Sequence, residues 1–184
     1  MYSKYVKRFL DIIFSIVLIL VLWPLFIIVG LISKITTGNI IYKQNRDGFS
    51  KKSFVIYKFQ SMLNGGVDRY QRTPKIMRYI RALGLDELPQ LINILKGDMS
   101  FVGPRPFITD EELPIEPEPI IYTMKPGVVS LAVANGRRKI SYKKRLKYDY
   151  IYATNVSFKL DVYIIFKTLG LLIKQNIRGE SWKK

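Results

Sequence analysis

The longest apolar stretch of this chain runs from Ile12 to Ile32 and carries no charged side chain. A helix of about 20 residues crosses the hydrocarbon core of a bilayer, so this stretch is long enough to enter a membrane. A cleaved signal peptide fits less well, because the stretch is too long and no small-x-small cleavage site follows it. We therefore expect a membrane helix, with a buried core helix as the alternative.

Trp23 and Pro24 lie near the middle of this stretch. Pro24 removes a backbone hydrogen-bond donor and favours a kink. Basic residues flank the stretch on both sides, with Lys4, Lys7 and Arg8 before it and Lys34, Lys43, Arg46, Lys51 and Lys52 after it. Basic flanks prefer the cytoplasmic face, so a straight span would place one flank wrongly. We favour a re-entrant helix that bends at Trp23–Pro24 and returns to the face it entered, over a kinked single span.

The next segment has the composition of a small β-hairpin. Residues 40–42 and 53–59 are rich in β-branched and aromatic side chains, and Arg46-Asp-Gly48 has the composition of a turn. We therefore predict a hairpin within 40–59, followed by a short basic helix over 75–82.

An amphipathic helix is predicted over residues 87–96. Its apolar residues Leu88, Leu91, Ile92 and Leu95 follow the i, i+3, i+4, i+7 spacing of one helix face. Pro89 is acceptable in the first turn, and Gly97 provides a stop.

Three segments complete the pattern. Residues 110–118 hold five of the fourteen acidic residues among prolines, which predicts a solvated loop rather than a metal site. Residues 137–147 carry seven basic residues, which indicates a helix that faces phosphates or lipid headgroups, or a solvated face. Residues 160–177 form an apolar helix with a narrow lysine stripe, suited to a membrane interface or to core packing.

Together these elements predict an α+β fold that is predominantly helical, a monotopic membrane protein with an N-terminal re-entrant helix and a small hairpin. We divide the chain into a membrane helix over 1–36 and a catalytic domain over 37–184 that lies at the membrane surface with amphipathic helices.

Composition narrows the chemistry. Thirty basic against fourteen acidic residues give a net charge of +16, which implies an anionic partner such as nucleic acid, a lipid surface or a phosphorylated substrate. A basic surface is expected beside an anionic membrane, and no nucleic-acid-binding motif is present, so we expect no nucleic-acid partner. The absence of histidine and cysteine removes thiolate sites and the commonest metal ligand and general base.

Carboxylates therefore become the leading chemical candidates. Asp86 and Glu87 are adjacent, and Asp86 falls at or next to the expected N-cap of the helix over 87–96, where a capping role is ordinary. Adjacent carboxylates can also share a divalent cation. Arg105, between two prolines, is either a surface residue or a phosphate ligand, since arginine binds phosphate through two hydrogen bonds. A Mg²⁺–carboxylate site that faces an arginine suits a diphosphate substrate.

With these motifs, the chain resembles the small monotopic phosphoglycosyl transferases, bacterial sugar transferases that initiate glycan assembly on a polyprenol carrier. The resemblance covers nearly the whole chain and is carried by Arg8-Phe-Leu-Asp11, the proline-broken apolar stretch, Gln44-Asn-Arg46, Tyr57-Lys-Phe-Gln-Ser-Met62, Leu85-Asp-Glu-Leu-Pro-Gln-Leu91, Lys96-Gly-Asp-Met-Ser-Phe-Val-Gly-Pro-Arg-Pro106, Lys125-Pro-Gly127, Asn135-Gly-Arg137 and Asp149-Tyr150.

The resemblance implies transfer of a sugar 1-phosphate from a UDP-sugar to undecaprenyl phosphate, with release of UMP and with Mg²⁺. It implies that Asp86 is the nucleophile and contacts Mg²⁺, and that Glu87 completes a catalytic dyad. Matching of residues makes Arg105 a phosphate ligand, and Asn135 and Arg137 ligands for the nucleotide-sugar. The implied location is the bacterial inner membrane, with the catalytic domain among anionic headgroups on the cytoplasmic face.

The chain departs from the family pattern at two places. Trp23-Pro24 replaces the common Ser-Pro at the bend, and Val128–Ala134 replaces a segment close to Ile-Thr-Gly-Trp-Ala-Gln-Val. The second departure keeps a non-catalytic, membrane-anchored scaffold for glycan-assembly enzymes as the alternative function.

Overall fold

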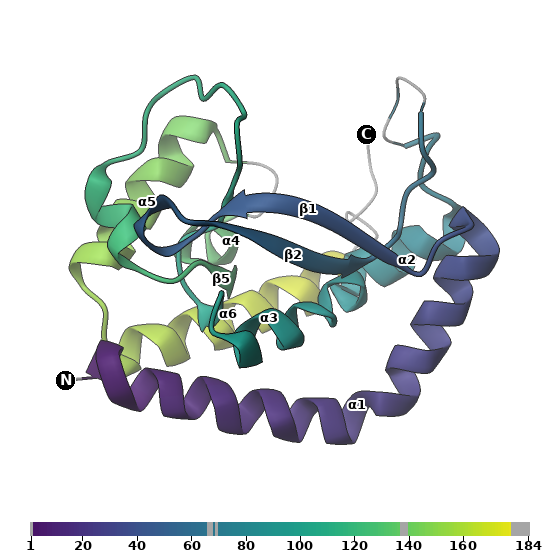
Figure 1. The fold of residues 1–184 in the computed structure, drawn as a ribbon, viewed down its shortest axis with the longest axis horizontal. Coiled ribbons are helices and arrows are strands. Elements are labelled where there is room, and N and C mark those ends of the chain that lie inside the picture. The colour runs from purple at the N-terminus through teal and green to yellow at the C-terminus, as the bar shows by residue number, and fades with distance from the viewer. Residues whose placement is uncertain (1, 66–67, 69, 137–139, 178–184) are drawn as a thin grey trace.

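A computed structural model of the chain describes residues 2–65, 68, 70–136 and 140–177. It shows helices arranged around two small sheets, an α+β fold that is mostly helical, as expected (Figure 1). The helices are α1 (Lys7–Thr37), α2 (Lys75–Leu83), α3 (Gln90–Lys96), α4 (Leu131–Ala134), α5 (Tyr142–Thr154) and α6 (Phe158–Ile177). The strands are β1 (Ile41–Asp47), β2 (Ser53–Phe59), β3 (Ser100–Val102), β4 (Phe107–Ile108) and β5 (Gly127–Val129).

The apolar stretch forms the long helix α1, which a single π-helical turn, η1 (Tyr2–Val6), precedes. By length and composition α1 is able to cross a membrane. Figure 1 shows the helix bent sharply partway along its length, and Pro24 lies inside it. An interior proline removes one helical hydrogen bond and is a common cause of such a bend.

One side of α1 packs against the rest of the protein on both arms of the bend. Leu18 and Ile19 contact the core around Ile94 and Met99. Further along, Leu25, Phe26 and Val29 pack with Phe59, Met77 and Ile80. The opposite side exposes the large apolar residues Phe9, Ile13, Phe14, Ile16, Val17, Leu20, Val21, Trp23, Ile27, Ile28, Leu31 and Ile35. An apolar surface of this extent indicates contact with lipid or with another protein.

The predicted hairpin is confirmed as β1 and β2, which pair antiparallel from Ile41↔Phe59 to Asp47↔Ser53, and β4 adds a third strand beside β1. The predicted turn at Arg46-Asp-Gly48 was wrong in its placement. Arg46 and Asp47 continue β1 and pair with β4, and the chain reverses over residues 48–52, where Ser50 and Lys51 have positive φ.

The region around Asp86 differs from the prediction. The expected helix over 75–82 is confirmed as α2, but the helix expected over 87–96 begins only at Gln90. Asp86 lies in a short 3-10 turn, η3 (Leu85–Glu87), and does not cap α3. An N-cap at Asp86 would serve the N–H groups of the next two or three residues. Leu88 N–H already donates to the Leu85 carbonyl at 3.4 Å, and Pro89 has no N–H.

Two glycines let the backbone approach itself closely beside the parallel pair β3–β5. Gly103 N–H donates to Val129 O at 3.0 Å, and Gly127 N–H donates to Pro104 O at 2.9 Å. A Cβ on Gly103 would lie 2.3 Å from Lys125 O, and one on Gly127 would lie 2.0 Å from Gly103 N. Neither position has room for a side chain, so these contacts set the position of the loop that begins at Gly103.

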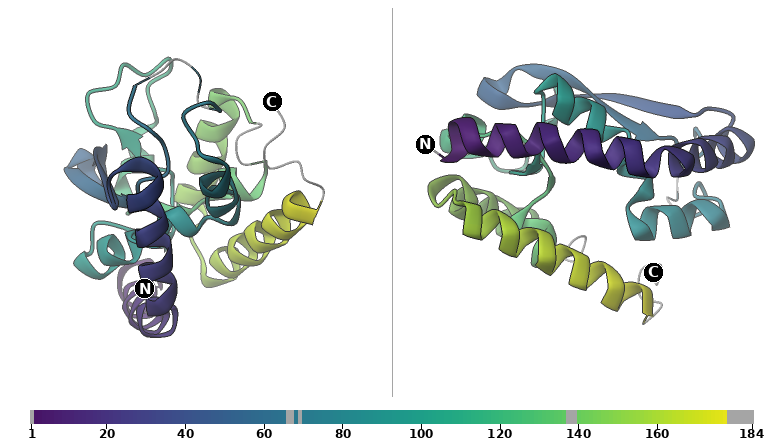
Figure 2. Two further views of the ribbon diagram at one scale, coloured as in Figure 1. Left: turned by 90° about the vertical axis from the view of Figure 1, so that its right-hand side faces the viewer. Right: turned by 90° about the horizontal axis from the view of Figure 1, so that it is seen from below.

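The C-terminal half largely follows the predictions. The acidic residues of 110–118 lie exposed on an irregular segment, which confirms a solvated loop. The predicted basic helix corresponds to α5, which starts at Tyr142 behind the N-cap Ser141; residues 137–139 lie outside the described part. The apolar helix over 160–177 is confirmed as α6, whose start lies beside that of α1 (Figure 2). It exposes Phe158, Tyr163, Ile165, Phe166, Leu169 and Ile173.

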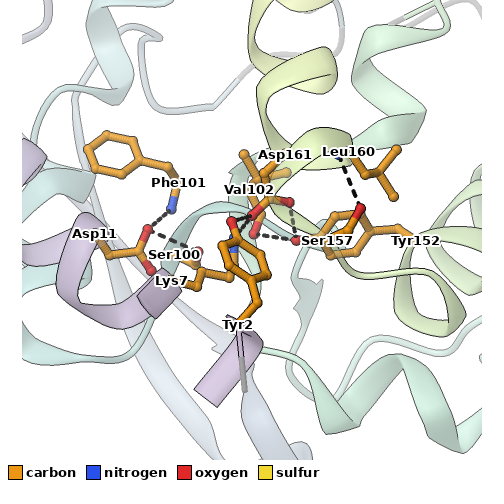
Figure 3. A network of polar contacts seen from close by, with 10 residues as sticks. All are labelled: Tyr2, Lys7, Asp11, Ser100, Phe101, Val102, Tyr152, Ser157, Leu160 and Asp161. Atoms are coloured by element: carbon orange, nitrogen blue, oxygen red, sulfur yellow. Dashed lines mark hydrogen bonds and ion pairs between the residues drawn. The ribbon is translucent and has the colours of Figure 1, made fainter. Parts of the chain in front are cut away.

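A buried polar network joins α1, β3, α5 and α6 (Figure 3). Asp161, 4% exposed, accepts hydrogen bonds from Tyr2 Oη at 2.6 Å and from Tyr152 Oη at 2.8 Å, and it forms an ion pair with Lys7. The Tyr152 hydroxyl also lies 3.1 Å from the Val102 carbonyl of β3. Asp11 of α1 accepts hydrogen bonds from Ser100 Oγ and from the Phe101 N–H, both at 3.1 Å. The N-terminal turns are thereby fixed to β3 and α6.

Asn93 provides the corresponding link between α3 and the hairpin. Its fully buried side chain donates from Nδ2 to the Val55 carbonyl at 2.7 Å and accepts from the Tyr57 N–H at 3.0 Å. Both partners belong to β2, so one amide holds this strand against α3.

We expect Asn93→Ala to destabilise the protein, because two buried backbone groups of β2 lose their partner. An unsatisfied buried group costs about 1–3 kcal/mol, so the melting temperature in detergent falls by several degrees. The exposed Asn155→Ala serves as the control. Equal melting temperatures for Asn93→Ala and the wild-type protein would contradict this assignment.

Candidate active site

Side chains from several elements meet in one pocket between the hairpin, η3 and the loop after β3. The lining residues are Arg46, Ile56, Lys58, Glu87, Gln90, Arg105, Pro106, Gly127 and Val128. Two residues predicted from the sequence, Glu87 and Arg105, therefore lie in the same pocket. The basic side chains on its wall come from β1, from β2 and from the proline-flanked loop.

Asp86 directly precedes the pocket residue Glu87 in the chain. It is buried, with 6% of its surface exposed. Its Oδ2 accepts a long hydrogen bond from Ser61 Oγ at 3.4 Å and lies 3.8 Å from Arg81 Nη1. Arg81 Nη1 also donates to Ser61 Oγ at 2.6 Å. A cation and a hydroxyl thus orient the carboxylate. The Gly84 turn, which ends α2 with a φ of 76°, directs the chain back so that Asp86 lies next to Arg81.

Glu87 forms an ion pair across the pocket wall. Lys58 Nζ, from β2, donates to Glu87 Oε1 at 2.7 Å, and both side chains are partly buried. Asn93 determines which residues of β2 lie beside α3, so the amide contact and this ion pair belong to the same strand–helix junction. The pair neutralises the charge of Glu87 and leaves Arg46 and Arg105 as the remaining charges of the lining.

Arg105 is exposed, whereas the flanking Pro104 and Pro106 are buried. Its carbonyl accepts from Arg145 Nη2 of α5 at 2.7 Å, and Arg46 Nη1 lies 3.4 Å from the Pro106 carbonyl. The Arg145 guanidinium stacks on the Phe107 ring at 4.4 Å. The loop is therefore held through its backbone while the Arg105 side chain extends toward solvent and the pocket.

Burial and the close arginines affect the proton affinities around this loop. Burial, followed by the nearby Arg105, lowers the pKa of Arg46. Asp149 of α5 is fully buried and lies 3.6 Å from Arg145 Nε. The Arg105 backbone N–H and the Arg145 guanidinium are the described groups that face its oxygens, but neither is well enough aligned to form a regular hydrogen bond. Burial raises the pKa of Asp149 to about 7, against the opposing effects of Arg145 and of the Arg105 backbone N–H.

The structure does not place Asn135 in this pocket. Asn135 ends α4, donates from Nδ2 to Leu131 O at 2.8 Å and accepts from Lys167 Nζ of α6 at 2.8 Å. Arg137 lies outside the described residues. Trp23 and Pro24 lie within α1, where Trp23 is 59% exposed.

The carboxylates near the pocket are the candidate ligands for Mg²⁺. Among residues 2–65, 68, 70–136 and 140–177, no three acidic side chains gather closely enough to form a metal site by themselves. Mg²⁺ in phosphate-handling sites usually takes one or two carboxylates, with substrate phosphates and water as the other ligands. The adjacent Asp86 and Glu87 supply oxygen donors of this kind, so the residues fit a metal that a substrate phosphate helps to hold.

Several pocket residues had no predicted role, namely Arg46, Lys58 and Gln90, together with Ser61 and Arg81 near Asp86. All but Arg81 belong to the segments Gln44–Arg46, Tyr57–Met62 and Leu85–Leu91 that carry the family resemblance. Those segments therefore contained a signal by which the additional pocket residues could have been predicted. Their convergence depends on β1–β2 pairing and on Asn93, which spacing along the chain does not reveal.

Comparison with known proteins gives consistent matches. A family model described as bacterial sugar transferase matches residues 2–175. The undecaprenyl-phosphate galactose phosphotransferase of Salmonella typhimurium is 33% identical, over 95% of this chain and 42% of its own length. The exopolysaccharide production protein ExoY of Sinorhizobium fredii is 34% identical, over 89% of this chain and 83% of its own length.

A third relative is the UDP-N-acetylgalactosamine-undecaprenyl-phosphate N-acetylgalactosaminephosphotransferase of Aeromonas hydrophila. It is 34% identical over 92% of this chain and 44% of its own length. The chain thus spans less than half of the galactose and N-acetylgalactosamine phosphotransferases, but most of ExoY.

We expect Asp149 to make the protein less stable as the pH rises from about 4 to about 7. Its raised pKa means that the folded state holds a proton which the unfolded state releases over this range. Melting temperatures measured from pH 4.5 to pH 8 should therefore fall more steeply in the wild-type protein than in Asp149→Asn. Glu112→Gln, at an exposed acidic position, should follow the wild-type slope. Parallel slopes for Asp149→Asn and the wild type would exclude a titrating Asp149.

Proposed function

This chain belongs to the bacterial sugar transferase family, and from that premise we propose that it transfers a sugar 1-phosphate from a UDP-sugar to undecaprenyl phosphate, releasing UMP. The names of its relatives support this, because they pair undecaprenyl phosphate with UDP-N-acetylgalactosamine or with galactose. The observation that carries the proposal is the pocket itself. Glu87, Arg105 and further basic side chains line it, and the buried Asp86 directly precedes Glu87 in the chain.

In the first proposed step, an Asp86 carboxylate oxygen attacks the phosphorus that bears the sugar. A bond forms between that oxygen and phosphorus, the bond from phosphorus to the bridging oxygen breaks, and UMP leaves with the bonding electrons. Carboxylates are established covalent nucleophiles toward phosphoryl groups and need no histidine to activate them. Ser61 and Arg81 orient the attacking group. Arg105 binds phosphate oxygens, and Glu87 completes the dyad.

In the second proposed step, an oxygen of undecaprenyl phosphate attacks the same phosphorus and releases the Asp86 carboxylate. Two successive displacements let a soluble donor and a lipid acceptor use one site in turn. Mg²⁺ held at Asp86 with a substrate phosphate would supply positive charge to the phosphoryl oxygens. Asn135 and Arg137 remain proposed ligands of the nucleotide-sugar; this role requires Asn135 to exchange its contact with Lys167 for one with substrate.

We assign residues 1–36 to a re-entrant anchor and residues 37–184 to the catalytic part at the cytoplasmic face of the bacterial inner membrane. The bend in α1, the interior Pro24 and the basic flanks support a helix that returns to its face of entry. The contacts of both arms with the protein support it as well, because a straight span would carry one arm away. Anionic headgroups then lie beside the basic surface.

We expect detergent-solubilised protein to release UMP from at least one UDP-sugar when undecaprenyl phosphate and Mg²⁺ are present. Asp86→Asn should lower the rate by at least about 1,000-fold, because an amide is a poor nucleophile. Asp110→Asn, in the exposed acidic loop, should remain active. Full activity of Asp86→Asn would exclude the covalent route. The absence of release from every donor would favour a non-catalytic scaffold.

The proposed topology is tested by single cysteines, since the chain has none of its own. Ser3→Cys and Lys43→Cys flank α1, and both positions are exposed. A membrane-impermeant maleimide should label both in inverted vesicles and neither in intact spheroplasts. Labelling of the two cysteines from opposite sides would exclude the re-entrant form.

A further inference from the structure

Two buried hydrogen-bond donors on the wall of the pocket have no acceptor among the described residues. Gln90 is 1% exposed and its Nε2 has no hydrogen-bond partner there. The Nε of Arg46 is likewise buried without one. Both residues line the pocket that holds Glu87 and Arg105.

Among the described residues, the Nε atoms of Arg81 and Arg145 are also buried without an acceptor, but neither residue lines this pocket. The other buried side-chain amides of the described residues have acceptors. Asn93 Nδ2 donates to Val55 O at 2.7 Å, and Gln60 Nε2 lies within 3.3 Å of Met62 O. Buried donors without acceptors reduce stability and are rare in native proteins. Two of them on the wall of one pocket indicate that an acceptor from outside the chain completes the site.

The rest of Arg46 is already fixed by contacts. Its Nη2 donates to Gln44 Oε1 at 2.6 Å, and its Nη1 lies 3.4 Å from the carbonyl of Pro106. The contact with Pro106 joins β1 to the loop that carries Arg105, and the two contacts together hold the guanidinium in place. The orientation of the Arg46 guanidinium, including its unpaired Nε, is therefore fixed in the absence of ligand.

The charge of the pocket identifies the class of ligand. Lys58 neutralises Glu87, which leaves Arg46 and Arg105 as the cations of the lining that have no ion pair among the described residues. The missing partner must accept hydrogen bonds and carry negative charge, and phosphoryl oxygens do both. Gln90 follows the Asp86–Glu87 pair by one helical turn, so its amide belongs to the same end of the pocket.

We propose that Gln90 and Arg46 are substrate-binding residues, whose side-chain N–H groups donate to non-bridging oxygens of the UDP-sugar diphosphate. The inference rests on the proposed function and adds two ligands to Arg105. Gln90 supplies a neutral donor that holds a phosphoryl group without adding charge. Arg46 supplies positive charge from β1, whereas Gln90 belongs to α3.

Gln90→Met provides the main test, because methionine keeps the volume and removes the orphaned donor. The affinity for UDP, measured by calorimetry on detergent-solubilised protein, should fall about 10- to 100-fold, as expected for a lost hydrogen bond to a charged group. The affinity for uridine, which has no phosphate, should be unchanged. The melting temperature without ligand should stay the same or rise, because a buried unsatisfied group has gone.

Gln60→Met is the matched control, since its buried amide has acceptors within the chain. It should lower the melting temperature and leave the UDP affinity within twofold of wild type. For the arginine, Arg46→Lys keeps the charge but removes the Nε donor, and it should weaken UDP binding. Arg72→Lys, on a half-buried arginine outside the pocket whose Nε donates to the Leu63 carbonyl, should leave UDP binding unchanged.

The outcomes separate this inference from the proposed function. If the wild type binds UDP and releases UMP while Gln90→Met binds UDP equally well, the role of Gln90 is wrong and the transferase remains. A lower melting temperature for Gln90→Met with unchanged UDP affinity would likewise make Gln90 a purely structural residue. If the wild-type protein binds no UDP and releases no UMP from any donor, the proposed function and this inference both fail.

Discussion

Strand β3 is held by buried carboxylates from two helices that lie far apart in the sequence. Asp11 of α1 accepts from Ser100 and Phe101, while Tyr152, fixed by Asp161 of α6, lies beside the carbonyl of Val102 (Figure 3). The next residue, Gly103, begins the loop that presents Arg105. Buried carboxylates are costly unless they are hydrogen-bonded or paired, so these contacts tolerate little displacement. The position of Arg105 therefore depends on both helices.

The apolar helix α1 is consequently part of the framework that holds the candidate site. Its inner face supplies Phe26 and Val29 to the core that also contains Phe59 and Met77. The same helix contributes Asp11 to the network behind Arg105, and Arg8 donates to the Leu95 carbonyl at the end of α3. An anchor joined by a flexible linker would have none of these contacts. The pocket and the exposed apolar face of α1 are thereby held in a fixed position relative to each other.

Most helices and strands could be predicted from the sequence. The predictions failed where contacts between distant segments determine the position of a residue. The length of the uncharged run located α1, β-branched and aromatic residues located the hairpin, and a lysine stripe on an apolar segment located α6, because each is a strong local signal. Asp86 was misplaced as an N-cap, since the pattern of Leu88 and Leu91 does not show that Leu88 N–H is already used. The pairing of Glu87 with Lys58 depends on Asn93, a buried polar residue with no periodic signature. The carboxylates stood out because histidine and cysteine are absent, and Arg105 stood out because two prolines flank it. The roles of Arg46 and Gln90 are suggested only by the pocket that they line.

The two-sided packing of α1 has a consequence for handling the protein. A detergent must cover the outward residues such as Trp23 and Leu31 without competing for the inward ones. Small, harsh detergents can solvate both faces, which would displace Phe26 and Val29 from the core while the chain stays soluble. Loss of activity on extraction would then indicate that the structure around the pocket has loosened. A lipid nanodisc would preserve the packing of α1 better than such a detergent.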